Sequence, residues 1–546
     1  MAIIRDFFFR LSSPDSFSRV LYLAPLIRFN SNMNRLALGL LLTGFIATTH
    51  AAPKHPNIVY ILADDLGIGD VSCYNPESKI QTPHVDRMAA EGMRFTDAHT
   101  PSAVCTPTRY GILTGRYCWR TRLKYRVLDG FDPPLIKPDQ VTVASLLKSS
   151  GYDTACVGKW HLGMTFTDNE GNPMRAVSID RKTKPRPGTE VDYSVPITGG
   201  PTAVGFDSYF GISASLNMSP FCYLKNDRPV HIPNIPHPRM QTEFISVDEG
   251  VRSADFAIRG VMPRFAGEAV SVIEQQAAER PDRPFFLYAP LSSPHLPVVP
   301  NDEFLGRSEA GDYGDFVVET DAFVGAILDA LDRTGMAENT LVIFTSDNGG
   351  LYHWWKPQEA DDVAKYRISK RGASMKTYGH QGNMKYRGTK ADIWEGGHRV
   401  PFVVRWPGKT PAGSVSNVLI ELTDLLKTSA AIVGENLPDT AGQDSTNVLP
   451  ALLAAKPEKP VREFAIHHSL WGDFAIRKGP WKMIPQRGSG GFTYPKTIDP
   501  AKDGGPAGQL YNVANDPSET KNLWDENPNI VAELQAQLDS VKKQNR

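Results

Sequence analysis

The chain has 546 residues, of which 41% are hydrophobic and 22% are charged, and its formal net charge is −1. This ordinary globular composition excludes a disordered chain, and the balanced charge gives no general affinity for nucleic acid. The length predicts two to four domains, or one large α/β domain with an appendage.

The N-terminal residues have the pattern of a secretory signal. Arg35 precedes an apolar run over residues 36–47, and small residues surround Ala51. This pattern predicts a signal peptide that starts at Met33 and is cleaved near Ala51. The run is too short for a typical transmembrane helix, so we expect a secreted or periplasmic protein without stable membrane insertion. An N-terminal membrane anchor is the alternative, and the sequence assigns no role to residues 1–32.

Strand-like and helix-like segments alternate between residues 57 and 344. Strands are predicted at residues 57–63, 152–157, 284–289 and 340–344. Helices are predicted at residues 82–95, with Thr82 as the cap and Gly92 at the end, and at residues 141–149, 269–278 and 317–331. Residues 164–250 carry few regular signals. The alternation predicts an α/β fold with a large, mostly parallel sheet flanked by helices.

The pattern changes past Pro407. A strand is predicted just before it, at residues 402–406. Past Pro407, short strand-like runs at 464–468, 474–477, 481–484 and 509–513 precede an amphipathic helix at 529–541. This predicts a smaller C-terminal antiparallel sheet with a terminal helix. We therefore divide the chain into three parts: an extension with the signal peptide (1–52), a main domain with the candidate catalytic motifs (53–445), and a C-terminal subdomain (446–546).

The most informative motif is Cys-Thr-Pro-Thr-Arg at residues 105–109. Proline is well tolerated in the first turn of a helix, so Pro107 predicts a helix that starts just after Cys105 and stops at Gly115. Residue 105 then lies near a helix N-terminus, which favours an anion, and Arg109 adds a positive charge one turn later. The alternative is a buried structural cysteine.

Four polar clusters follow predicted strands at their carboxyl ends, where ligands bind in open α/β sheets. They are Asp64 with Asp65, Lys159 with His161, His295, and Asp347 with Asn348. The oxygen ligands suit a hard cation such as Ca²⁺ or Mg²⁺ rather than zinc. The cations and imidazoles suit a sulfate or phosphate, and Lys390 is a further candidate. Singly, each cluster has an ordinary alternative, such as a turn or a solvated side chain.

Together these motifs resemble those of type I sulfatases, which are formylglycine-dependent, arylsulfatase-like enzymes of the alkaline-phosphatase superfamily. The matching motifs are ADDLG at 63–67, CTPTR at 105–109 with LTGR at 113–116, GKWHLG at 158–163, SPH at 293–295, SDNG at 346–349, and Lys390 with WEGG at 394–397. The resemblance runs from Pro56 to the C-terminus. Asn217 and residues 223–228 also resemble pocket walls of bacterial carbohydrate sulfatases.

The resemblance implies an alkaline-phosphatase-like fold and a sulfuric ester hydrolase. Cys105 would be oxidised to formylglycine by a separate maturation enzyme. One calcium ion would be bound by residue 105 together with Asp64, Asp65, Asp347 and Asn348. The expected substrate is a sulfated saccharide or an aryl sulfate.

The same resemblance implies roles for five further side chains. Arg109 would hold the aldehyde hydrate, and Lys159 and Lys390 would hold the sulfate oxygens. His161 would act on the hydrate as a base, and His295 or Lys390 would protonate the leaving oxygen. The family often places a further serine or similar polar residue in the site, and the sequence assigns none between residues 164 and 250.

Substrate recognition has a second possible signal. Residues 356–390 contain nine Lys or Arg against three acidic residues, and aromatic residues precede them at 352–355. Aromatic rings and cations suit a sulfated sugar, whereas a solvated loop with two core tryptophans is an equal alternative. The sequence does not define the sugar, the sulfated position, endo or exo action, or the oligomeric state.

Two other functions and the state of the cysteines stay open. A phosphoesterase of the same superfamily would usually carry Ser or Thr as its nucleophile, which Cys105 argues against. A non-catalytic protein that binds sulfated glycans is the second alternative, although every expected catalytic position is filled. The four remaining cysteines allow two disulfides, in any of three pairings, or free thiols: Cys73, Cys118, Cys156 and Cys222.

Overall fold

A computed structural model of the protein describes residues 55–176, 186–242, 244–353 and 376–544. The predicted signal peptide lies outside these ranges, as do residues 356–375 of the basic segment at 356–390. Within them, no helix is both long and apolar enough to cross a membrane. All five cysteines are described, and none forms a disulfide.

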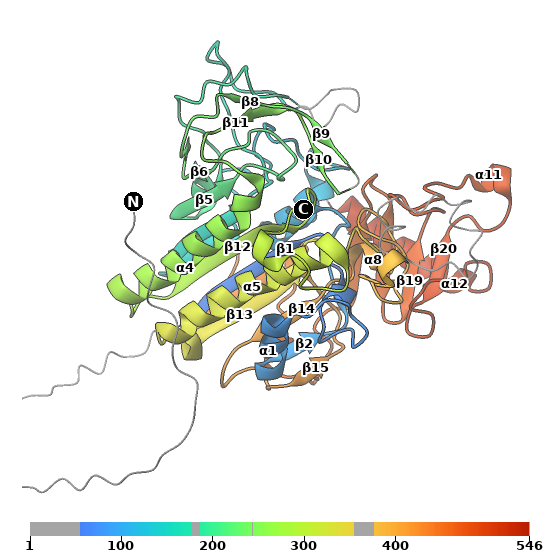
Figure 1. Ribbon diagram of the computed structural model, residues 1–546. Helices are drawn as coiled ribbons and strands as arrows, with labels where there is room; N and C mark the ends of the chain where they lie inside the picture. The colour runs from blue at the N-terminus through green and yellow to red at the C-terminus, as the bar shows by residue number, and fades with distance from the viewer. Residues whose placement is uncertain (1–54, 177–185, 243, 354–375, 545–546) are drawn as a thin grey trace, which may run out of the picture. The chain divides into compact units, whose positions relative to one another are not determined.

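Ten of the described strands form one mixed sheet (Figure 1). In spatial order they are β15 (Ser414–Ser416), β2 (Met93–Phe95), β14 (Phe402–Arg405), β13 (Thr340–Ser346), β1 (Asn57–Asp64), β12 (Phe285–Pro294), β4 (Asp153–Lys159), β5 (Ser208–Ile212), β6 (Leu224–Lys225) and β7 (Arg228–Pro229). The central strands, β13 to β5, are parallel to one another. The predicted large, mostly parallel sheet is confirmed.

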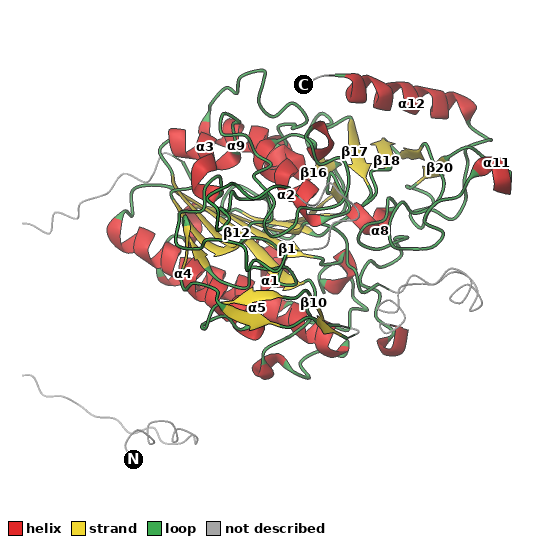
Figure 2. Cartoon of the chain, turned by 90° about the horizontal axis from the view of Figure 1, so that it is seen from above, coloured by secondary structure: helices red, strands yellow, loops and turns green. Residues whose placement is uncertain are grey.

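Strand β1 shows why the sheet carries helices on both faces, because all eight of its residues are buried. Ile58, Tyr60 and Leu62 face one apolar cluster, and Val59, Ile61 and Ala63 face another. The first cluster includes residues of α2 (Cys105–Thr114), α3 (Val143–Ser149), α9 (Leu425–Val433) and α10 (Leu449–Leu453). The second includes residues of α1 (Pro83–Glu91), α4 (Val261–Glu279) and α5 (Gly311–Arg333). Figure 2 shows these two helical layers on opposite sides of the strands.

A smaller antiparallel sheet follows in the C-terminal part. Its described strands are β17 (Phe464–His468), β18 (Phe474–Lys478), β19 (Trp481–Ile484) and β20 (Gln509–Asn512). Leu534, Leu538 and Val541 of α12 (Pro528–Lys543) pack against one face of this sheet. The predicted antiparallel sheet with its terminal helix is confirmed, whereas the domain boundary near residue 445 stays a prediction.

The remaining described elements are short. Three two-stranded pairs are β8 (Ile235–His237) with β11 (Gly250–Arg252), β9 (Met240–Gln241) with β10 (Ser246–Val247), and β3 (Ala98–His99) with β16 (Ile420–Glu421). The short helices are α8 (Glu395–His398) and α11 (Pro500–Asp503).

Two predicted features differ from the structure. The helix predicted at residues 82–95 ends at Glu91, and residues 93–95 form β2 beside β14. A Cβ atom on Gly92 would lie only 2.0 Å from the Val404 carbonyl oxygen, so this close approach requires glycine. The second difference is β5, which joins the parallel sheet from a region where the sequence gave few signals.

Candidate active site

The four predicted polar clusters meet at one edge of the parallel sheet. Asp64 is the last residue of β1, and Lys159 is the last residue of β4. His295 follows β12 directly, and Asp347 follows β13 directly. The parallel strands point the same way, so their carboxyl ends bring together residues that are far apart in the sequence.

Helix α2 places Cys105 at this edge. The helix begins at Cys105 and ends before Gly115, whose φ of 61° is the left-handed conformation that favours glycine. The Cys105 side chain is buried, and its Sγ lies 3.5 Å from Asp64 Oδ1. Burial raises the pKa of the Cys105 thiol to about 12. An unmodified thiol is therefore protonated at neutral pH and is a poor nucleophile.

The loop before Cys105 is held by distant segments. The Ala103 N–H donates to the His468 carbonyl of β17 at 3.0 Å, and the Ala391 N–H donates to the Ala103 carbonyl at 2.7 Å. The C-terminal sheet and the segment around Lys390 thus fix the backbone that leads into the helix.

Arg109 is fully buried one turn after Cys105. Its Nε donates to Asp347 Oδ2 at 2.9 Å, and its Nη1 donates to the Lys159 carbonyl at 2.9 Å. Its Nη2 lies 2.8 Å from Asp347 Oδ2 and 3.3 Å from the Leu291 carbonyl. These contacts tie α2 to three strands and fix a positive charge beneath the site.

Lys159 and Lys390 each form an ion pair with one of the adjacent residues Asp64 and Asp65. Lys159 Nζ donates to Asp64 Oδ2 at 2.6 Å, and Lys390 Nζ donates to Asp65 Oδ2 at 2.8 Å. Burial alone would lower the pKa of Lys390, but the charge of Asp65 raises it well above its usual range. Lys390 is therefore a cation at neutral pH.

Asp64, Asp65, Cys105 and His295 each offer a ligand atom, and these atoms lie within 4.8 Å of one another. Burial alone would raise the pKa of Asp64, but Lys159 beside it holds that pKa well below its usual range. This group overlaps the predicted ligand set and adds His295 to it.

Asp347 and Asn348 border the same group. Asp347 Oδ1 accepts from the Asp65 backbone N–H at 3.3 Å, and burial with the nearby charge of Asp64 raises the pKa of Asp347 to about 7. Asn348 Nδ2 donates to Asp65 Oδ1 at 2.8 Å, while the buried Asn348 Oδ1 has no partner among the described residues. A buried amide oxygen without a partner beside carboxylates fits a hard cation.

The two histidines are held in different ways. His161 Nε2 lies 2.9 Å from the Leu128 carbonyl, so Nε2 carries the proton and the buried, unpartnered Nδ1 is the acceptor nitrogen. Burial lowers the pKa of His161 well below its usual range. His295 Nδ1 donates to the Leu296 carbonyl at 2.5 Å, and its Nε2 lies 3.7 Å from Asp65 Oδ2. Burial, with Lys390 nearby, lowers the pKa of His295 to about 4.

Polar residues that the sequence did not assign also border the site. Ser213 and Ser215 follow β5, and their buried Oγ atoms have no hydrogen-bond partner in the described chain. The backbone N–H of His161 donates to the Ser213 carbonyl at 2.9 Å. Thr106 Oγ1 donates to the His161 carbonyl at 3.0 Å. The sequence analysis did not predict β5. Prediction of that strand would have placed Ser213 at its carboxyl end, where the other polar clusters lie.

The predicted aromatic segment after Asn348 is only partly described. Tyr352 and His353 are fully buried, and Tyr352 packs against Tyr313 and Phe244. These two residues therefore belong to the core and do not stack on a sugar. Trp354, Trp355 and residues 356–375 lie outside the described ranges.

Comparison with known proteins identifies the family of this chain. A family model described as Sulfatase matches residues 56–435. The chain belongs to the sulfatase family. It is 33% identical to N-acetylgalactosamine-6-O-sulfatase of Bacteroides thetaiotaomicron, over 90% of this chain and 93% of that protein. It is 32% identical to human arylsulfatase A, over 88% of this chain and 85% of that protein. This sulfatase is therefore a sulfuric ester hydrolase.

Solved structures agree with the fold. A Bacteroides thetaiotaomicron sulfatase, described in connection with the metabolism of multiple glycosaminoglycans, aligns with a TM-score of 0.73 and 31% identity. The alignment covers 90% of this chain and all of that one. A sulfatase from Pseudoalteromonas sp. aligns with a TM-score of 0.65 and 24% identity over 89% of this chain and 90% of its own, which shows the fold alone.

Proposed function

We propose that this sulfatase releases sulfate from a sulfated carbohydrate, with formylglycine derived from Cys105 and one bound calcium ion. The observation that carries the proposal is the position of Cys105, at the start of α2 and in contact with Asp64 among paired cations. The raised pKa of the thiol argues against an unmodified Cys105 as the nucleophile, because the protonated side chain would be a poor one.

The charges of the site favour an added cation and an anionic substrate. Asp64, Asp65 and Asp347 face Arg109, Lys159 and Lys390. Burial and Asp64 raise the pKa of Asp347 to about 7, and a bound divalent cation would keep this carboxylate ionised, so that three negative charges would meet three positive ones. A divalent cation held by Asp64, Asp65, Asp347, Asn348 and residue 105 leaves the site with a surplus of two positive charges. That surplus attracts a sulfate ester.

When hydrated, formylglycine supplies the hydroxyl that attacks sulfur, and calcium neutralises charge on the sulfate oxygens. The ammonium groups of Lys159 and Lys390 each retain donors beyond their aspartate partner for those oxygens. Arg109 is committed to protein acceptors, so it contributes a fixed charge and orients Asp347 next to residue 105.

Proton transfer falls to the remaining side chains. His161 Nδ1 is the acceptor nitrogen of a neutral imidazole, which suits a base acting at residue 105. His295 and Lys390 are each 7% exposed, more than the other site residues, so they lie closest to the opening where the alcohol leaves. We assign protonation of the leaving oxygen to one of these two residues. Lys390 already carries its proton, whereas His295, with a pKa of about 4 and its Nδ1 proton donated to Leu296, would first have to gain a proton at Nε2.

We further propose that the sulfated sugar is a 6-O-sulfated N-acetylgalactosamine unit. The support is the similarity to the N-acetylgalactosamine-6-O-sulfatase of Bacteroides thetaiotaomicron and to the N-acetylgalactosamine-6-sulfatases of dog and pig. The dog and pig enzymes are 33% and 32% identical to this chain. Export through the signal peptide at Met33 and oxidation by a separate maturation enzyme complete the proposal.

A parallel assay tests this function. Protein co-produced with a maturation enzyme is given 6-O-sulfated N-acetylgalactosamine, its 4-O-sulfated isomer, an aryl sulfate and an aryl phosphate. We expect sulfate release from the 6-O-sulfated sugar to exceed release from the 4-O isomer by at least about tenfold. Dominant phosphate release would overturn the reaction class, and equal turnover of both isomers would overturn the sugar assignment.

A further inference from the structure

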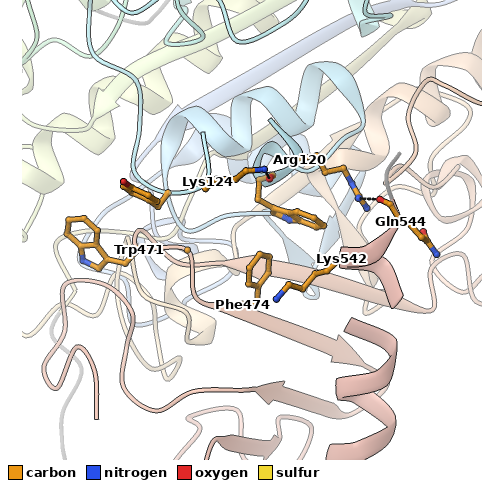
Figure 3. A pocket seen from close by; sticks show the side chains of 9 residues that line it. Arg120, Lys124, Trp471, Phe474, Lys542 and Gln544 are labelled. Atoms are coloured by element: carbon orange, nitrogen blue, oxygen red, sulfur yellow. Dashed lines mark hydrogen bonds between the residues drawn. The ribbon is translucent and has the colours of Figure 1, made fainter. Parts of the chain in front are cut away.

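A pocket with a volume of about 430 Å³ lies outside the cluster around Cys105 (Figure 3). It is built from the segment after α2, the loop between β17 and β18, and the end of α12. Its lining combines aromatic rings with cations and contains no acidic residue. Six of the lining side chains are aromatic or carry an ammonium group: Trp119, Lys124, Tyr125, Trp471, Phe474 and Lys542.

The inner wall of the pocket is an aromatic surface flanked by positive charge. The rings of Trp119 and Phe474 meet edge to face with centroids 5.4 Å apart. Lys542 Nζ lies 4.4 Å from the Phe474 ring centroid, and the guanidinium of Arg120 lies 4.4 Å from that of Trp119. Arg120 is neutralised by buried Asp444, so its role here is to hold the wall in place.

The outer wall is open to solvent. Trp471 is 38% exposed, which is unusual for a tryptophan and leaves ring surface available for contact. Lys124 is also exposed, and neither Lys124 nor Lys542 forms an ion pair with any described residue. Lys124 uses one donor on the Trp119 carbonyl, at 2.6 Å, and keeps its others.

Backbone contacts connect the segments of both walls to segments of the candidate active site. The Leu470 N–H, next to Trp471, donates to the Ala391 carbonyl at 2.9 Å, and Ala391 is next to Lys390. Trp471 Cα therefore lies within about 13 Å of Lys390 Cα. On the other side, the chain runs from Tyr125 to Leu128, whose carbonyl holds His161.

These features match the chemistry of an anionic sugar. A sugar ring can pack its apolar face on an exposed indole ring, while a sulfate or carboxylate group is attracted to ammonium groups. The lining offers both within one pocket, and its distance from Lys390 is within reach of a single oligosaccharide chain.

We propose that this aromatic and cationic pocket binds a second anionic sugar unit of the same glycan whose sulfate ester lies at residue 105. The inference rests on the proposed carbohydrate function. It assigns Trp471 and Lys542 to the recognition of chain length, so the enzyme prefers an oligosaccharide over a single sulfated sugar.

Kinetics on two substrates test the proposal. The substrates are 6-O-sulfated N-acetylgalactosamine and a tetrasaccharide with two such units. For Trp471→Ala and Lys542→Glu, we expect kcat/KM on the tetrasaccharide to fall about tenfold relative to the monosaccharide, mainly through KM. The control is Tyr494→Ala, which removes an aromatic ring that is 40% exposed and outside the pocket. Equal changes on both substrates, or no change, would overturn the pocket.

Binding without turnover separates this proposal from the proposed function. Calorimetry measures the affinity of the Cys105→Ala protein for the tetrasaccharide, with and without Trp471→Ala. A roughly tenfold loss caused by Trp471→Ala supports the pocket even where the wild-type enzyme hydrolyses none of the tested sugars, in which case only the proposed substrate fails. If the wild-type enzyme hydrolyses the sugars but Trp471→Ala does not change the affinity for the tetrasaccharide, the proposed pocket is wrong and the proposed function is unaffected.

Discussion

In the described part of the chain, two buried clusters of charged and imidazole side chains each offer at least three potential metal ligands, and we propose a reactive site at only one of them. The first is the active-site cluster around Cys105. The second, here called the histidine cluster, contains His99, His398, His467, Lys482, Glu395 and Glu519. Both contain three or more potential metal ligands within 4.8 Å of one another.

Most ring nitrogens of the histidine cluster have hydrogen-bond partners within the protein. Lys482 Nζ lies 2.9 Å from His398 Nε2, His398 Nδ1 lies 3.0 Å from His99 Nδ1, and His99 Nε2 lies 2.9 Å from Asp97 Oδ1. Because Lys482 donates to His398 Nε2, the His398 ring carries its proton on Nδ1. His398 Nδ1 then donates to His99 Nδ1, and His99 Nε2 donates to Asp97. Among the ring nitrogens of the three histidines, only His467 Nε2 has no partner.

Ring geometry also separates the two clusters. The rings of His398 and His467 stack with centroids 3.9 Å apart and planes 10° apart. An ion cannot lie in both ring planes at once, so these two histidines do not share a metal. Instead His467 Nδ1 donates to the Thr100 carbonyl at 2.9 Å, which positions the loop that leads to Cys105. Similar residue types therefore serve structure in the histidine cluster, whereas we propose that those around Cys105 serve chemistry.

Replacing the nucleophile should have the largest effect on turnover. Cys105→Ala removes the only proposed source of the attacking hydroxyl, so we expect kcat to fall by about 10⁴-fold or more. Cys222→Ala is the matched control, because Cys222 is also buried but lies outside both clusters. Sulfate release assays with folded protein make the comparison, and a small loss for Cys105→Ala would contradict the account.

Metal removal should have the next largest effect. Loss of calcium leaves the three carboxylates and the substrate without a shared cation, so chelation should reduce turnover by about 10²-fold or more, reversed by added Ca²⁺. Calcium at about 100 times its Kd should also raise the free energy of unfolding by about 2.7 kcal/mol. Asp65→Asn should abolish this stabilisation, and Asp97→Asn, beside the histidine cluster, should leave it intact. A calcium response that depends on Asp97 would reverse the two assignments.

Loss of the leaving-group acid should depend on the leaving group. His295→Asn and Lys390→Ala are compared on the sugar sulfate and on an aryl sulfate with an acidic phenol. For the variant that lacks the acid, we expect about a 10²-fold loss on the sugar and a much smaller loss on the aryl sulfate, since a phenolate leaves without protonation. The other variant should lose similar activity on both substrates. If neither variant discriminates, a different group supplies the proton.

The smallest effect on turnover is expected in the histidine cluster. Lys482→Met leaves Glu395 and Glu519 buried without their shared cation, so the free energy of unfolding should fall by about 3–5 kcal/mol. Turnover per folded molecule should stay within about threefold, because Lys482 has no proposed contact with substrate. Denaturant unfolding and titrated activity measure the two quantities. A large loss of turnover in fully folded protein would show that the cluster participates in catalysis.

Local patterns in the sequence predict much of the fold. The uniformly apolar runs of β1 and β13 identify buried parallel strands, and Pro107 with Gly115 marks the ends of α2. Because parallel strands share the direction of their carboxyl ends, the convergence of Asp64 and Asp347 could be anticipated from the chain alone.

The missed features depend on contacts between distant segments. In β5, a Cβ on Gly211 would lie 1.8 Å from the Gly158 carbonyl oxygen, so this strand depends on close approach to β4 rather than on its own pattern. Ser213 was missed with it. The histidine cluster draws residues from positions 99, 398 and 467, and no local motif connects them. The pairing of Ala103 with His468 is equally invisible in the sequence.

The most direct measurement is the mass of the tryptic peptide that spans residues 95–109, taken from active enzyme produced together with a maturation enzyme. We predict an aldehyde at residue 105, and we expect the aldehyde and the activity to decrease together when the maturation enzyme is omitted. Active enzyme in which residue 105 is entirely an unmodified cysteine would contradict it.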